Sequence, residues 1–335
     1  MNTKPYTGTG SELAITGVGF QPDWTWIKGR NVAYDNNVFD AVRGSTKRMM
    51  TNQTTAETTQ AQMIKSFDSD GFTLGTDGGV NENNTRTYVA WNWKANGQGS
   101  SNTDGSINTT YTSANTTGGF SIIKYAGTGS SGTIGHGLSA TPKVLIIKEI
   151  DGTESWRVWH RNAPNYSTKA LSLDSNSAEF SQTNWIGTVD NSIITLGSDS
   201  SINTSGNNYI CYSFADVQGY SKFGSYTGNS GNNADAPFIY TGFKPSFFLV
   251  KNTAQASAWE MYDNKRLGYN DANYQFRANE SAGEGTTSDY VDFISNGMKI
   301  RHQGGGINET GDVFIYMAFA EAPLVGTNGV TAKAR

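Results

Sequence analysis

Val313–Val330 reads VFIYMAFAEAPLVGTNGV, and its first half decides the fold. Large and smaller side chains alternate along residues 314–320, which is the pattern of a β-strand because successive side chains leave opposite faces. The same strand occurs twice earlier, at residues 209–215 and 88–94, and the three segments align without gaps. We therefore expect three copies of one β-rich unit, each closed by this strand.

A second repeated pattern is a proline, five further residues and a lysine. It occurs at three places: Pro22 and Lys28, Pro142 and Lys148, and Pro245 and Lys251. A proline suits the first position of a strand, where no ladder N–H is lost. The intervening residues 144–147 and 247–250 are apolar throughout, as in a strand buried on both faces. We expect each lysine to lie at the end of its strand with its ammonium group in solvent, in a structural and not a catalytic role.

Shorter motifs repeat at matching places in each unit. A Tyr-x-Gly motif opens the unit, and an aliphatic residue followed by Asn precedes the closing strand: Tyr6–Gly8 and Val80-Asn81, Tyr125–Gly127 and Ile202-Asn203, Tyr226–Gly228 and Ile307-Asn308. About 100 residues per unit, many short strands and frequent Asp-Gly or Asn-Gly turns are typical of a β-sandwich. Residues 56–67 are the best candidate for a helix, and for this segment the sequence favours a helix and a non-helical structure equally.

The predicted organisation is three tandem β-sandwich units. Unit 1 covers residues 1–94, unit 2 covers 120–217 and unit 3 covers 218–323. Residues 95–119 are a linker or an extra hairpin, and residues 324–335 are a C-terminal tail. A repeat of this length favours side-by-side domains over a solenoid of short repeats.

Composition excludes several classes of protein. The 335 residues are 36% hydrophobic, yet they include 8 Trp, 16 Tyr and 16 Phe, and a chain so rich in aromatics is not disordered. A net charge of −4 argues against nucleic-acid binding. The single cysteine, Cys211, is expected to be a small core residue. No apolar run is long enough to span a bilayer, and no signal region is evident, so we expect no membrane insertion.

One segment has the spacing of a catalytic motif. Glu149, Asp151 and Glu154 match the Glu-x-Asp-x-x-Glu pattern of laminarinase-like retaining glycosidases, which need two carboxylates about 5 Å apart on one strand face. Here Asp151-Gly152 indicates a turn, so we expect an exposed hairpin and no catalytic residue. The three histidines lack metal-ligand spacing. The sequence therefore predicts no enzyme, no metal and no cofactor.

Exposed aromatic side chains could stack on sugars. The candidates for glycan stacking are Trp24, Trp26, Trp156 and Trp185. The alternative is that these indoles pack in the core, because each unit has a large residue at the strand that contains Trp26. The sequence alone leaves both interpretations open.

Several stretches together resemble a domain family from marine bacteriophages. They are the segment 314–330, the segments 102–107 and 119–125, and the segments 70–75 and 88–91, and the resemblance covers nearly the whole chain. It implies concanavalin-A-like or jelly-roll-like sandwiches in virion structural proteins, often labelled tail fibre or host-recognition proteins. The chain has no coiled coil or collagen-like run to trimerise a fibre shaft, which favours a compact component.

The resemblance implies a non-enzymatic virion structural protein displayed on the particle exterior. It would be a tail fibre, a tail appendage or a capsid decoration protein, assembled in the host cytoplasm. Its partners would be other virion proteins of the capsid or tail, further copies of itself in a homo-oligomer, and a host surface glycan. The alternative is a lectin-like module that binds or cleaves carbohydrate.

Overall fold

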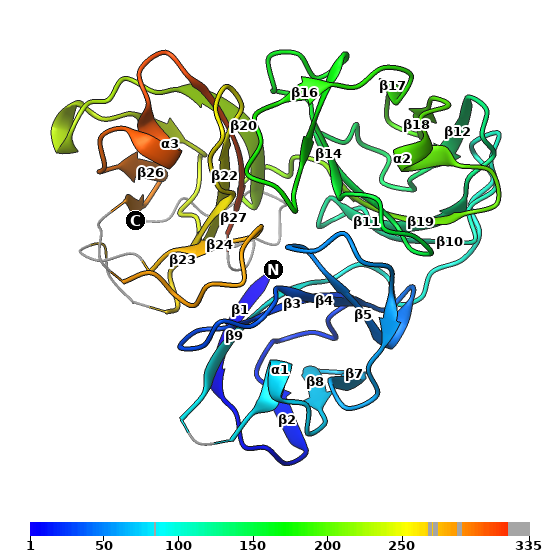
Figure 1. The fold of residues 1–335 in the computed structure, drawn as a ribbon, viewed down its shortest axis with the longest axis horizontal. Coiled ribbons are helices and arrows are strands. Elements are labelled where there is room, and N and C mark those ends of the chain that lie inside the picture. The colour runs from blue at the N-terminus through cyan, green and yellow to red at the C-terminus, as the bar shows by residue number, and fades with distance from the viewer. Residues whose placement is uncertain (84, 267–269, 271–273, 287–289, 321–335) are drawn as a thin grey trace, which may run out of the picture.

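A computed structural model describes residues 1–320 except 84, 267–269, 271–273 and 287–289. The predicted boundary at Pro323 and the predicted tail lie outside the described residues. The described chain is all-β, with several antiparallel sheets that are consistent with β-sandwich packing. Figure 1 shows three lobes around a common centre, with a larger sheet of each lobe nearer the centre and a smaller sheet farther out.

The first lobe contains a six-stranded and a three-stranded sheet within the described residues. The larger sheet has the order β1 (Asn2–Thr7), β9 (Thr87–Trp93), β3 (Trp24–Gly29), β4 (Asn37–Asp40), β5 (Gly44–Met50) and β6 (Thr58–Thr59). The smaller sheet has the order β2 (Leu13–Thr16), β8 (Gly71–Leu74) and β7 (Ile64–Asp68), and the helix α1 (Gly78–Asn81) follows β8. The helix considered for residues 56–67 is wrong, because β6 and β7 lie there and Ile64 pairs with Leu74.

The second lobe contains a seven-stranded and a three-stranded sheet in the described chain. The larger sheet has the order β10 (Tyr111–Asn115), β11 (Phe120–Ala126), β19 (Asn208–Phe214), β13 (Val144–Glu149), β14 (Arg157–His160), β15 (Lys169–Ser172) and β16 (Phe180–Ser181). The smaller sheet has the order β12 (Gly132–Gly135), β18 (Ile193–Leu196) and β17 (Ile186–Val189), with α2 (Ser200–Asn203) after β18. Strand β10 forms a hairpin with β11 and adds an edge to the larger sheet.

The third lobe contains a five-stranded and a three-stranded sheet where the chain is described. The larger sheet has the order β20 (Ser221–Thr227), β27 (Val313–Phe319), β22 (Phe247–Asn252), β23 (Glu260–Asp263) and β24 (Phe276–Arg277). The smaller sheet has the order β21 (Phe238–Tyr240), β26 (Gly297–Ile300) and β25 (Val291–Ile294). The 3-10 turn η1 (Asn233–Asp235) precedes β21, and α3 (Gly305–Asn308) follows β26.

The strand pairings repeat from lobe to lobe in the same register. The closing strand lies between the first long strand and the strand after the proline, as expected from their apolar character. Its last large residue faces the first residue of the post-proline strand in every lobe: Trp93 and Trp24, Phe214 and Val144, Phe319 and Phe247. Residues that share a ladder position in different lobes are called equivalent below.

The repeated Tyr-x-Gly and Asn motifs form one buried clamp per lobe. In the second lobe the Tyr125 hydroxyl donates to the carbonyl of Ile202 at 2.7 Å. The Asn203 side chain accepts from Thr128 N at 2.8 Å and donates to two carbonyls. A Cβ on Gly127 would overlap the Thr204 carbonyl oxygen, so the close approach of two backbones requires glycine. The equivalent residues of the other lobes make the same contacts: Tyr6, Gly8 and Asn81, and Tyr226, Gly228 and Asn308.

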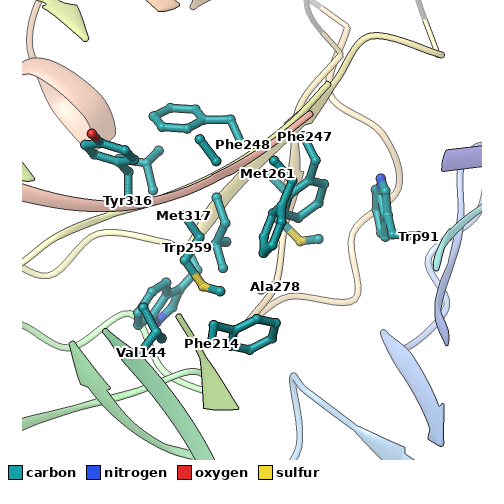
Figure 2. Packing of buried hydrophobic residues seen from close by; sticks show 14 of the residues in the cluster. Trp91, Val144, Phe214, Phe247, Phe248, Trp259, Met261, Ala278, Tyr316 and Met317 are labelled. Carbon is teal, nitrogen blue, oxygen red and sulfur yellow. The ribbon is translucent and has the colours of Figure 1, made fainter. Parts of the chain in front are cut away.

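The larger sheets of the first and second lobes are buried on both faces because each separates a core of its own lobe from a second, shared core. Along β13, Leu145 and Ile147 pack against the smaller sheet of the same lobe. Val144 and Ile146 point the other way, into a joint core to which all three lobes contribute. Figure 2 shows this joint core, where Trp91 of the first lobe and Phe214 of the second lie among side chains of the third.

Alternation along the strands thus decides which core a side chain enters. The equivalent residues Trp91, Tyr212 and Met317 share one face of their strands with Trp93, Phe214 and Phe319, because residues two apart in a strand point to the same side. The ring of Phe319 lies 5.6 Å from that of Trp93 and 5.9 Å from that of Phe214, so this face of the three closing strands meets in the joint core.

Candidate functional site

The three repeated lysines are buried, and the prediction that they reach solvent is wrong. Lys28, Lys148 and Lys251 are each fully inaccessible. Burial lowers the pKa of each ammonium group to about 8, because the charged form loses its hydration. A buried ammonium group needs several acceptors, and carbonyl oxygens supply them here.

Two of these lysines connect neighbouring lobes. Lys28 Nζ donates to the carbonyls of Tyr34 at 2.5 Å and of Ser281 in the third lobe at 2.8 Å. Lys251 Nζ donates to its own neighbour Asn252 at 2.6 Å and to Asn176 of the second lobe at 3.4 Å. The two lysines therefore hold loops of neighbouring lobes in place by donating to main-chain carbonyls.

Lys148 instead binds within its own lobe. Its Nζ donates to the carbonyls of Glu149 at 2.7 Å and Gly152 at 3.0 Å. The proline that precedes each lysine by six residues stands just before its strand, as predicted from its missing N–H. These prolines are Pro22, Pro142 and Pro245.

A main-chain hydrogen bond crosses each lobe boundary at equivalent positions. The acceptor is always the carbonyl two residues after the repeated lysine, and the donor is the N–H of a glutamate in the neighbouring lobe. Glu57 N donates to Ile150 O at 2.9 Å, Glu179 N to Thr253 O at 2.9 Å, and Glu284 N to Arg30 O at 2.7 Å. The first lobe thus binds the second, the second binds the third, and the third binds the first. The chain closes on itself as a ring.

A second set of equivalent contacts lies beside this ring of main-chain bonds. Trp156 Nε1 donates to Met50 O of the first lobe at 2.9 Å, and Trp259 Nε1 donates to Ser172 O of the second lobe at 2.8 Å. At the third boundary the equivalent residue is Asn36, whose amide donates to the carbonyls of Arg277 and Glu280 at 3.1 and 2.8 Å. A side-chain N–H therefore donates to the same edge of the neighbouring lobe at all three boundaries.

A third set places a polar side chain of one lobe against the closing strand of another. Asp40 accepts from the Tyr212 hydroxyl at 2.7 Å, and Asp263 accepts from Trp91 Nε1 at 3.0 Å. The equivalent His160 has its Nε2 at 3.1 Å from the Tyr316 carbonyl. Burial lowers the pKa of His160 to about 4, which keeps the ring neutral at ordinary pH.

Buried arginines complete two of these boundaries. Arg43 pairs with Asp40 at 2.5 Å, and its other terminus reaches Glu57 at 3.1 Å. At the equivalent place Arg266 pairs with Asp263 at 2.6 Å and with Glu284 at 2.8 Å. A buried charge without its partner is costly, so each arginine fixes the aspartate and the glutamate of its own lobe that bond to the neighbouring lobe.

The four tryptophans considered for glycan stacking are all buried. Trp24, Trp26 and Trp156 are at most 2% exposed and lie in the joint core. Trp185 is also 2% exposed and packs beneath the smaller sheet of the second lobe. The core-packing interpretation describes them, because no ring face is open to a flat sugar platform.

The acidic segment of the second lobe does not form a carboxylate pair on one strand. Strand β13 ends at Glu149, and Asp151 lies in the bend that follows, as the Asp-Gly pair predicts. Asp151 accepts from Asn208 at 2.7 and 2.8 Å, whereas Glu149 accepts from the Asn207 side chain. The expectation of a fully exposed hairpin is wrong for Glu149, which is only 5% exposed because Asn207 and the bend cover it.

The single cysteine and His136 are buried side chains of the second lobe. Cys211 is buried, as expected, and burial raises the pKa of its thiol well above the usual range. His136 is buried with Nε2 at 3.2 Å from Asp190 O, and burial lowers its pKa. Among the described residues, no group of three or more potential ligands could hold a metal ion. No described helix is long and apolar enough to cross a membrane.

These features define a class: an all-β protein whose antiparallel sheets are joined through a common core and a closed set of polar contacts. The chain belongs to the family described as a domain of unknown function, DUF7483, which it matches over residues 1–323. That match includes every strand of the three lobes. Neither the curated proteins nor the solved structures include a match to the chain.

Sequence reasoning missed the polar residues at the boundaries. Glu57, Glu179 and Glu284 each come seven positions after an equivalent strand residue: Met50, Ser172 and Arg277. The stretch between the repeated lysine and that strand differs in length between the lobes, so an alignment on the lysines does not bring the glutamates into register. The signal that could have found them is their constant acceptor, two residues after each repeated lysine.

Proposed function

We propose that the chain consists of three tandem concanavalin-A-like or jelly-roll-like β-sandwich units that close into a ring. The shared ladder registers and the three buried clamps support this division. Each boundary uses two different surfaces, and such head-to-tail contacts produce a closed ring when the rotation between neighbours is right. In this proposal one chain has the interfaces that a cyclic homotrimer would have.

We further propose that this ring is a non-enzymatic structural component on the exterior of a bacteriophage virion. The observation that carries the proposal is the use of the repeated polar residues. Two of the three repeated lysines bind neighbouring lobes, as do acids and indoles at equivalent positions, and these bonds give them an architectural role. The resemblance to marine phage structural proteins points to the particle, where the partners are capsid or tail proteins.

A compact ring suits a tail appendage or a capsid decoration protein better than a fibre shaft. In Figure 1 the three smaller sheets lie on the outside of the ring, where they are available to partner proteins, to further copies of the chain or to a host surface. A pseudo-three-fold disc could bind at a three-fold position of a particle through similar contacts from each lobe. One chain would then occupy each such three-fold position, so the symmetry of the particle would set the number of copies.

The alternative from another class is a module that binds or cleaves carbohydrate. A retaining glycosidase needs two carboxylates about 5 Å apart that act on one bond. Glu149 and Asp151 bind different asparagines, and Glu154 lies 3.8 Å from Arg157. This arrangement favours the structural role over glycan cleavage at this segment.

The proposal is tested by following the protein in phage particles purified by density-gradient centrifugation. We expect the intact chain to co-purify with particles in a fixed stoichiometry and to be accessible to antibody on the particle surface. In parallel, the purified chain is incubated with algal and bacterial polysaccharides. Turnover that Glu149→Gln abolishes, with no protein in the particles, would replace the structural proposal with the enzymatic one.

A further inference from the structure

A hollow of about 260 Å³ opens on the smaller sheet of the second lobe. Trp185 and Ile186 are buried among its lining residues, whereas Ser167 and Asn184 are exposed. The complete lining is Ser131, Ser167, Asn184, Trp185, Ile186, Gly187, Thr195, Gly197 and Ser198. None of these side chains carries a charge.

Several polar groups of the hollow have no partner within the described residues. No hydrogen bond occupies the side chains of Ser167, Asn184 or Ser198 in that part of the chain. The indole Nε1 of Trp185 is buried and finds no acceptor there either.

The uncharged lining distinguishes this place in the second lobe, because ion pairs include equivalents of its lining residues in the other two lobes. In the first lobe, Glu12 and Lys65 are equivalent to Ser131 and Gly187, and they form an ion pair across the sheet. In the third lobe, Asp292 is equivalent to Gly187 and Arg301 is equivalent to Gly197, and these two side chains form an ion pair at 3.2 Å.

Small, uncharged residues at both positions distinguish the second lobe from the first. Ser131 carries one hydroxyl where the first lobe has a carboxylate, and Gly187 has no side chain at all. The floor differs too, since the first lobe has Met63 at the position of Trp185. The second lobe therefore combines an open entrance with an aromatic floor.

We propose that this hollow binds one neutral sugar unit. A pyranose has hydroxyl groups that match the seryl, threonyl and amide groups of the rim, and a C–H face that matches the apolar floor. The uncharged lining gives no counter-charge to a phosphate or a uronate. The volume accommodates one ring, so a longer glycan would bind through a terminal or protruding residue.

This inference goes beyond the structural role, and it also differs from the flat stacking platform considered from the sequence. It requires only that one lobe displays a pocket to solvent. A particle protein without sugar affinity would still satisfy the proposal made for the ring. The two proposals therefore fail independently.

The test uses the full chain and a panel of neutral methyl glycosides and short neutral oligosaccharides. Binding is measured by saturation-transfer NMR and by titration calorimetry at millimolar concentrations, where weak single-site binding is detectable. Glucuronate and adenosine are included, because an acidic sugar and a flat base probe the other ligand chemistries. We expect binding of at least one neutral sugar and none of glucuronate.

The decisive variant combines Ser131→Glu with Gly187→Lys, which places the ion pair of the first lobe in the second. We expect it to weaken sugar binding at least about tenfold because the pair fills the entrance. The matched control, Glu12→Ser with Lys65→Gly, changes the first lobe in the reverse direction and should leave binding unchanged. Thermal melting shows whether each variant is folded.

A milder variant tests the proposal even if the decisive variant does not fold. Ser167→Ala with Ser198→Ala removes two exposed hydroxyl groups and should weaken binding about fivefold, as expected from the loss of one or two hydrogen bonds. The inference is wrong if no neutral sugar binds, if adenosine binds in preference to every sugar, or if the ion-pair variant and its control bind sugar equally well.

Discussion

Phe214→Ala should loosen all three lobes, although Phe214 belongs to the second. Its ring stacks on Phe120 at 4.8 Å and lies 5.9 Å from Trp24 of the first lobe. It also lies 6.0 Å from Phe223 and 5.9 Å from Phe319, both in the third lobe. The side chain is fully buried, so its truncation removes contacts with every lobe at once.

The expected cost is about 3–5 kcal/mol, the usual range for a buried phenylalanine changed to alanine. That is a large share of the roughly 5–15 kcal/mol that stabilises a folded domain. If the three units were separate domains, as the sequence favours, this loss would stay within the second unit. The joint core instead predicts that the loss spreads across the lobe boundaries.

Leu145→Ala is the matched control. Leu145 is equally buried but faces the smaller sheet of its own lobe, so its truncation should cost about 2–5 kcal/mol in the second lobe. Hydrogen exchange of backbone amides measures both variants. Phe214→Ala should accelerate exchange in β9 and β27 as well as β19, whereas Leu145→Ala should act first on β12, β17 and β18. Exchange that accelerates only in the second lobe for Phe214→Ala would refute the joint core.

Three further predictions concern pH and the clamp. The pKa of His160 is lowered to about 4 by burial, so the unfolded chain takes up a proton below its ordinary pKa of 6.5 and the folded chain does not. Stability should therefore fall by up to about 3 kcal/mol as pH drops from 6.5 to 4, and His160→Gln should flatten that slope in denaturant titrations. Burial raises the pKa of Glu260 from 4.5 to about 7, so between these pH values the unfolded chain releases a proton that the folded chain keeps. The free energy of unfolding should therefore decrease as pH rises from 4.5 to 7 through this group, and Glu260→Gln should remove that decrease. Gly127→Ala should lower the melting temperature far more than Gly206→Ala. A Cβ at position 127 overlaps a carbonyl oxygen, whereas a Cβ at position 206 meets open space and costs only the positive-φ strain of about 1 kcal/mol. Equal melting temperatures of the two variants would contradict the clamp.

The strands were predictable because their signal is local. Alternation along the closing strand and the apolar runs after each proline identified the central strands and the faces of Trp91, Tyr212 and Met317 correctly. The residues of the buried clamp could be recognised in the sequence as a repeated motif. The reason for the glycine became clear only from the structure, where Gly127 lies close to the Thr204 carbonyl.

The environment of the second sheet face was not predictable from the same pattern. A strand that is apolar on both faces shows that both are covered, but it does not show that another lobe covers one of them. For that reason the repeated lysines were placed in solvent. Lys28 finds its acceptor on Ser281, more than 250 residues away in the sequence, and no local pattern encodes that distance.

The candidate sites illustrate the same limit. Trp24 and Trp185 could not be separated by sequence, yet one packs in the joint core and the other lies under a hollow. The hollow depends on small residues at Ser131 and Gly187, and small residues give no signal until their equivalents Glu12 and Lys65 are known.

The most direct test of the account is an image reconstruction of the phage particle at a resolution that separates β-sheets. The account predicts a three-lobed disc on the particle exterior, with the smaller sheets at its periphery and contacts to capsid or tail proteins. Purified particles that contain no such density, together with a chain that stays in the soluble fraction of the lysate, would contradict it.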